Sequence, residues 1–138
     1  MKFDETNIKT AERILRFAMI VTLFTAGVSK LFSHGGFADW YSAQFSKPEL
    51  RLHLPAFLTV SYLHAMPFLE IGIALGLAYT PLKKYFVYAW CLFFITLEFG
   101  HYILQEWSEV NQMIPYIILG AICLMLPNHR SLLKSDEA

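Results

Sequence analysis

KYFVYAWCLFFITLEFGHYILQ, residues 84–105, is the stretch that decides the fold of this chain. Between Lys84 and Gln105, the only side chains that readily carry charge near neutral pH are those of Glu98 and His101. A helix of roughly 20 apolar residues crosses a hydrocarbon core about 30 Å thick. Because lipid offers the backbone no hydrogen-bond partners, a span of this length is expected to be α-helical.

Three other stretches have the same character. They cover about residues 13–33, 56–79 and 111–127. The sequence is 56% hydrophobic and 16% charged, with a mean hydropathy of +0.43, whereas a soluble domain is nearer about 45–50% apolar and 25% charged. We therefore predict an all-α fold, in which residues 1–138 form a single membrane domain built as a four-helix transmembrane bundle.

Basic residues predict how the bundle is oriented. One side holds Lys2, Lys9, Arg13, Arg16, Lys83, Lys84, Arg130 and Lys134, and the other holds Lys30, Lys47 and Arg51. Because Lys and Arg are enriched in cytoplasmic loops, we expect both termini to be cytoplasmic and the protein to lie in the bacterial inner (cytoplasmic) membrane. Because the formal net charge is zero, the chain has no basic field for nucleic acid, and we expect none as a partner. The apolar spans make the lipid bilayer the expected partner.

The first outer loop contains an aromatic pattern. In GGFADWYSAQF, residues 35–45, Phe37, Trp40, Tyr41 and Phe45 recur at helical spacing. This pattern predicts a short helix that lies in the headgroup layer with its aromatic side chains toward the membrane. The alternative is that this helix caps the outer mouth of the bundle.

Small residues in the second span predict close helix packing. In GIALG, residues 72–76, Gly72 and Gly76 are four apart, a spacing that lets two helix backbones approach each other. The motif supports a compact bundle and carries no chemistry of its own.

Five polar residues are unexpected in these spans. They are Lys30, His64, Glu70, Glu98 and His101. A charged side chain at the centre of a membrane costs about 2.5–3.5 kcal/mol on insertion scales, so such residues are expected to face the protein interior or to pair. The helical rise places His101 about 7 Å, Glu98 about 12 Å and Glu70 about 20 Å below the outer ends of their helices, whereas Lys30 is expected near the outer end of its own span. We therefore expect an outward-opening polar chamber with Glu70 at its base.

Two segments resemble a known family. FTAGVSKLF, residues 24–32, and FLEIGIALGLAYTPLKKY, residues 68–85, are similar to motifs of the DoxX-like family of small membrane proteins. The resemblance implies a four-helix bundle and, by analogy with some members, a link to sulfur or quinone redox chemistry. It extends to Gly27, Lys30, Glu70, Gly72 and Gly76, of which the glycines would serve helix packing. Glu98 and His101 lie outside the matching motifs.

Three functions remain open from the sequence. The first is a quinone-interacting redox subunit, in which Glu70, Glu98 and His101 handle protons and Lys30 and His64 bind the ligand. Quinone is then the one cofactor expected, and aromatic walls would come from Tyr88, Trp90, Phe93, Phe94 and Phe99. The second is a non-catalytic scaffold or small-molecule carrier, in which Lys30 pairs with Glu70 to fix helix register. Either of these would involve a protein partner or a homo-oligomer.

The third function is a metal site, for which the sequence offers little. Glu98 and His101 form a single E-x-x-H motif, whereas di-iron bundles use two such motifs and further glutamates. Cys91 and Cys123 are far apart in the chain, and each is interpreted as a small buried hydrophobic residue. We therefore expect neither a metal centre nor a dithiol mechanism.

Overall fold

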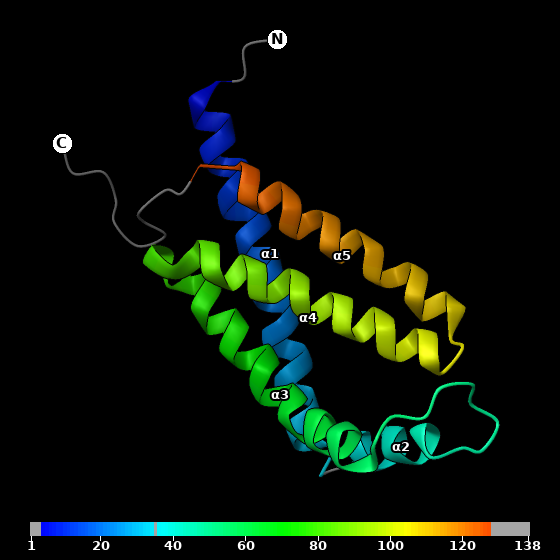
Figure 1. Cartoon of the computed structure of the whole chain (residues 1–138). Coiled ribbons are helices and arrows are strands. Elements are labelled where there is room, and N and C mark those ends of the chain that lie inside the picture. Colours follow the sequence, from blue (N-terminus) through cyan, green and yellow to red (C-terminus); the bar gives the residue numbers. More distant parts are fainter. Residues whose placement is uncertain (1–3, 35, 128–138) are drawn as a thin grey trace.

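The computed structural model describes residues 4–34 and 36–127 of the chain. The elements are α1 (Glu5–Phe32), α2 (Gly36–Phe45), α3 (Ala56–Ala78), the short 3-10 helix η1 (Thr80–Leu82), α4 (Lys83–Ile103) and α5 (Trp107–Met125) (Figure 1). These residues form helices and no strand, which confirms the all-α prediction. Four helical stretches are long and apolar enough to cross a membrane, and they coincide with the four predicted spans. The chain is thus a multi-pass membrane protein.

Helix α1 starts well before the predicted apolar span. Asp4 caps it, because its carboxylate accepts a hydrogen bond from the backbone N–H of Thr6 at 3.2 Å. Glu5 in the first turn interacts favourably with the positive end of the helix dipole. Its Oε1 also lies 3.0 Å from Lys9 Nζ. With 28 residues, α1 is about 42 Å long, so it exceeds the thickness of a hydrocarbon core by about two turns.

The four long helices form two pairs. Helix α1 packs mainly against α3, and α4 packs mainly against α5. The two pairs meet beside η1 and separate toward α2 (Figure 1). We call the side with η1, Glu5 and Met125 the η1 end, and the side with α2 and the α4–α5 turn the α2 end. Both ends of the described chain lie at the η1 end, as an even number of crossings requires.

The core lies between the helix pairs, and apolar side chains also cover the outside. Fully buried members of the core include Met19, Leu23, Leu77, Val87 and Trp90. Large apolar residues remain exposed on the outer faces of all four long helices, among them Phe17, Phe57, Leu92 and Ile118. A surface of this kind suits acyl chains, which do not penalise exposed hydrocarbon as water does.

Candidate functional site

A pocket of about 500 Å³ lies at the α2 end, where α3 and α4 have separated. Its wall comes from α1, α2, α3, α4 and α5, and most of the lining side chains are apolar. Leu58 of α3 and Phe99 of α4 line it, yet about half of each side chain is exposed. The pocket therefore opens sideways between these two helices.

Helix α2 closes the outer side of this pocket. Phe37, Tyr41 and Phe45 are spaced four residues apart, so they share one face of α2, and all three line the pocket. Trp40 points elsewhere and is half exposed. Of the two interpretations of the aromatic pattern, capping of the bundle mouth describes three of the four residues. Burial, together with the negative charges of Glu106 and Glu109, raises the pKa of the Tyr41 hydroxyl above its usual 10.0.

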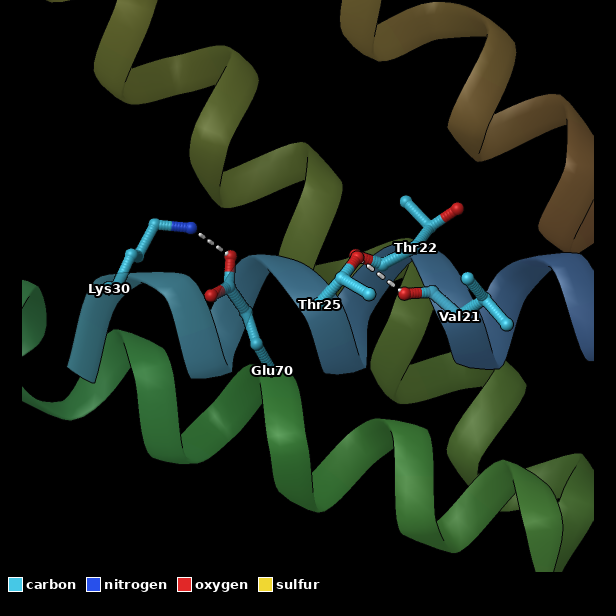
Figure 2. Close-up of polar contacts among 5 residues, drawn as sticks. All are labelled: Val21, Thr22, Thr25, Lys30 and Glu70. Atoms are coloured by element: carbon cyan, nitrogen blue, oxygen red, sulfur yellow. Dashed lines mark hydrogen bonds and ion pairs between the residues drawn. The ribbon is translucent and has the colours of Figure 1, made fainter. Parts of the chain in front are cut away.

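An ion pair joins α1 to α3 in the wall of the pocket. Lys30 Nζ lies 2.6 Å from Glu70 Oε1, and both residues line the pocket (Figure 2). Glu70 is 3% exposed and Lys30 is 18% exposed. The Lys30 ammonium also lies 5.0 Å from the centre of the Phe37 ring, a cation–π distance. Glu70 Oε2 is buried and makes no hydrogen bond within the described part of the chain.

The pairing of Lys30 with Glu70 corrects the predicted depths. Sequence position alone placed Glu70 far beneath Lys30. In the structure, Gly27 and Lys30 of α1 lie beside Pro67 and Glu70 of α3, because α1 ends while α3 continues for about two more turns toward the α2 end. Helix α2 packs against α3 at this end. The two charged side chains therefore lie at one level.

Gly27 allows the close approach of α1 and α3. A Cβ atom at this position would lie 2.7 Å from the carbonyl oxygen of Pro67 and 3.1 Å from Glu70 Cβ. Those distances are shorter than van der Waals contact, so only glycine fits without a shift of the backbone. The nearby Thr25 hydroxyl donates to the carbonyl of Val21 at 2.7 Å within α1 (Figure 2), so this polar group is satisfied without a partner helix.

A second polar pair lines the pocket, between α3 and α4. The Thr96 hydroxyl donates to the carbonyl of Phe93 at 2.7 Å, and the oxygens of Tyr62 and Thr96 are 2.6 Å apart. Because Thr96 has only one hydroxyl proton, Tyr62 must be the donor in this contact. Both hydroxyl protons are therefore used, and what remains for a ligand is acceptor capacity.

His101 lies at the mouth of the pocket. Its Nδ1 is 2.6 Å from Glu106 Oε2, and its ring meets the ring of Tyr41 edge-on. The chain reversal that brings Glu106 back is a Schellman motif. Gln105 has a φ of 59°, and the N–H groups of Glu106 and Gln105 donate to the carbonyls of His101 and Tyr102.

Two of the five predicted polar residues lie outside the pocket. Glu98 is half-buried, does not line the pocket, and has no hydrogen bond or ion pair with any described residue. His64 is exposed, and its Nδ1 donates to the carbonyl of Val60 in its own helix at 2.9 Å. It borders a smaller hollow that Lys30 also lines. The expected chamber thus forms around Lys30, Glu70 and His101 only.

The aromatic wall also differs from the sequence interpretation. Phe99 lines the pocket, but Trp90, Phe93 and Phe94 are buried in the core, and Tyr88 is half exposed. Trp90 Nε1 donates to the carbonyl of Tyr116 at 2.7 Å, which ties α4 to α5. Trp90, Phe93 and Phe94 therefore serve packing between helices. The pocket takes aromatic side chains from three helices: Phe37, Tyr41 and Phe45 of α2, Tyr62 of α3 and Phe99 of α4.

The other glycines divide into two groups. A Cβ at Gly76 would overlap the Phe86 ring, so this glycine lies at a close contact with α4. A Cβ at Gly72 would have nothing within 4 Å, so the packing role predicted for Gly72 is not met by any of the residues that the structure describes. Gly120, which the sequence reasoning missed, contacts Trp90 and Cys91 at the α4–α5 crossing.

The sequence reasoning also missed a buried cluster at the η1 end. Glu12 Oε1 lies 3.2 Å from Arg16 Nε and 2.7 Å from Lys83 Nζ, and Arg16 Nη1 donates to Thr80 Oγ1 at 3.2 Å. The side chains are at most 4% exposed. We call Glu12, Arg16 and Lys83 the buried triad. The sequence analysis used Arg16 and Lys83 only as basic residues that flank the spans and predict orientation. The signal that could have revealed the triad is Glu12, which lies one helical turn before Arg16.

The described residues contain no group of three or more His, Cys, Asp or Glu side chains arranged to hold a metal ion. Glu98 and His101 do not converge, because only His101 reaches the pocket. Cys123 is buried beside the triad and Cys91 is half-buried, and both are free thiols.

Comparison with known proteins returned no match: no family model fits the chain, and neither a curated protein nor a solved structure is similar to it.

Proposed function

We propose that this protein binds a lipophilic ligand with a compact polar head, of which a membrane quinone is the best fit, and serves as a subunit of a membrane redox system. The observation that carries the proposal is the Lys30–Glu70 ion pair in the wall of an apolar pocket. Ligand pockets typically combine apolar walls with a few placed polar groups, and their volumes run from about 300 to 1,000 Å³. Buried ionisable residues in membrane spans are hypotheses of function by default.

The shape of the pocket supports a ligand that comes from the bilayer. Leu58 and Phe99 leave the side between α3 and α4 open, while Phe37, Tyr41 and Phe45 close the outer side. A head ring would sit among these aromatics, and its apolar tail would leave through the lateral opening. The resemblance to the DoxX-like family points the same way, and we propose membership on the quoted motifs together with a cytoplasmic location for both termini.

The test is to purify the protein from native membranes and to measure bound quinone per chain by solvent extraction and mass spectrometry. We expect near-stoichiometric quinone, counted as the sum of its oxidised and reduced forms, in the wild type and in Glu98→Gln, and a large loss of this total in Glu70→Gln. Glu98→Gln is the matched control, since it makes the same chemical change outside the pocket. The absence of quinone from the wild type, both as purified and after reconstitution with quinone, would end this proposal.

A scaffold function has one observation in its favour. Lys30 and Glu70 pair where Gly27 brings α1 closest to α3, so the pair also fixes the register of these helices. Removal of one partner leaves a buried charge without compensation, which costs more than removal of both. If register is the main role, Lys30→Met with Glu70→Gln should unfold at a higher temperature than either single variant and should leave partner capture intact. Additive losses in the double variant would contradict it.

A further inference from the structure

The polar groups that line the pocket include both hydrogen-bond donors and hydrogen-bond acceptors. The hydroxyl protons of Tyr62 and Thr96 are already used, on Thr96 and on the Phe93 carbonyl. Their oxygens keep lone pairs that can still accept. The pocket thus offers acceptors at the α3–α4 side and no free hydroxyl donor from this pair.

The Lys30–Glu70 pair keeps both an acceptor and donors that are not used within the described part of the chain. Glu70 Oε1 accepts from Lys30 at 2.6 Å, while Glu70 Oε2 is buried with no partner among the described residues. A carboxylate oxygen can only accept, and a buried acceptor left without a donor is costly. Lys30 has three N–H groups, one of which is directed at Glu70, so it retains donors for a ligand.

A ligand hydroxyl satisfies both residues at once. Its oxygen can accept from the Lys30 ammonium, and its proton can be donated to the Glu70 carboxylate. A quinone carbonyl can do only the first of these, and it would bring its partial negative charge against the carboxylate. His101 does not consistently favour either form of the ligand. Its Nε2 accepts a hydrogen bond when the ring is neutral and donates one when the ring is charged.

We propose that the pocket selects the reduced, hydroxyl-bearing form of its ligand, a hydroquinone, over the corresponding quinone. This inference rests on the proposed function and assigns Glu70 as the specificity-determining residue, with Tyr62 as a second acceptor. A site built to accept a ligand hydroxyl strongly rejects an analogue that lacks it, because its own polar group is then left unpaired. One hydrogen bond to a charged group corresponds to a preference of roughly tenfold or more.

The ligand itself supplies the cleanest test, because no variant has to fold. The full chain in lipid nanodiscs is titrated by calorimetry with three probes: a decyl-substituted hydroquinone kept reduced under anaerobic conditions, the matching quinone, and the dimethyl ether of the hydroquinone. We expect the hydroquinone to bind at least about tenfold more tightly than either of the others. The ether keeps the ring and the tail but has no proton to donate.

Three variants test which residue sets the preference. Glu70→Gln gives the pocket an amide donor, so the ratio of hydroquinone to quinone affinity should fall toward one or invert. Glu98→Gln should leave the ratio unchanged, and Tyr62→Phe should lower it by less than Glu70→Gln does. A purely structural role for Glu70 would weaken all three probes together and would not change their ratio.

The outcomes separate the two proposals. If no probe binds to the wild type, the proposed function is wrong. If the probes bind but the quinone or the ether equals the hydroquinone, the pocket holds a quinone-like ligand and the inference about its reduced form is wrong. Equal binding by a simple long-chain alcohol would also contradict the choice of a ring-bearing hydroxyl.

Discussion

Two buried charged groups of this protein are alike in composition and different in surroundings. The buried triad of Glu12, Arg16 and Lys83 is fully enclosed at the η1 end, where the helix pairs meet. Lys30 and Glu70 pair at the α2 end, where the helix pairs have separated and a pocket begins. The first group does not line the pocket, and its ion pairs join α1 to α4. Each group holds a buried carboxylate oxygen without a hydrogen bond among the described residues, Glu12 Oε2 in the first and Glu70 Oε2 in the second, but only the second group lines a pocket that a ligand can fill.

The difference shows how position in the bundle decides what a buried charge does. At a closed crossing, every partner must come from the chain, and the triad draws its partners from α1, η1 and α4. At an open crossing, the chain can leave part of the hydrogen bonding to a ligand. A charge in a membrane span therefore indicates function when a cavity adjoins it and indicates structure when none does.

The largest effect is expected from Glu12→Gln. This change leaves Arg16 and Lys83 buried, close together and without their shared anion, which should lower the free energy of unfolding by about 3–5 kcal/mol. The measurement is thermal unfolding in detergent, followed by circular dichroism. The matched control is Glu5→Gln in the same helix, where an exposed pair with Lys9 contributes only about 0–1 kcal/mol. Equal midpoints for the two variants would remove the contrast between the regions.

An intermediate effect is expected from alanine at Gly27. The new Cβ would lie 2.7 Å from the carbonyl oxygen of Pro67, and this backbone atom cannot move aside easily. We expect a loss of about 1–3 kcal/mol and a weaker Lys30–Glu70 contact. Gly72→Ala is the control, with open space around the Cβ and a gain of up to about 1 kcal/mol from helix propensity. A neutral Gly27→Ala, by the same unfolding assay, would show that α1 and α3 are less closely packed.

The smallest effect concerns the mouth of the pocket at alkaline pH. Burial raises the pKa of Tyr41 in the folded state above the 10.0 of the unfolded chain. Below that pH both states keep the proton, so the contribution is fully present. Above it the unfolded state loses the proton first, and stability falls as the pH rises. Midpoints measured from pH 8 to 11.5 should fall less in Tyr41→Phe than in the wild type. If the midpoints of the two proteins fell equally with pH, the Tyr41 hydroxyl would not be buried.

The sequence was sufficient for the membrane spans because hydropathy and length are properties of each segment alone. The contacts between segments were harder to predict. Lys30 and Glu70 were expected at different depths, since nothing in either span reveals that α3 extends about two turns beyond α1. Lys83 and Arg16 were counted as flanking charges, because the basic residues that set orientation and those that bury a carboxylate look alike in sequence.

Glu98 and His101 show how precisely helical spacing can assign residues to a pocket. Three residues apart on a helix, they differ by about 60° around its axis, and the shared-face argument was sound. The edge of the pocket falls between them, so only His101 is inside. The position of that edge depends on α2 and on the angle between α3 and α4, which no residue pattern within α4 encodes.

The sideways opening between Leu58 and Phe99 has a consequence for any affinity measured on this protein. A hydrophobic molecule dissolves in the acyl chains before it meets the protein, so its effective concentration is a mole fraction in lipid and not a molarity in water. Diluting such a sample with buffer would barely change occupancy, whereas adding empty vesicles would lower it. Titrations at a fixed lipid-to-protein ratio are therefore the ones that can be compared between laboratories.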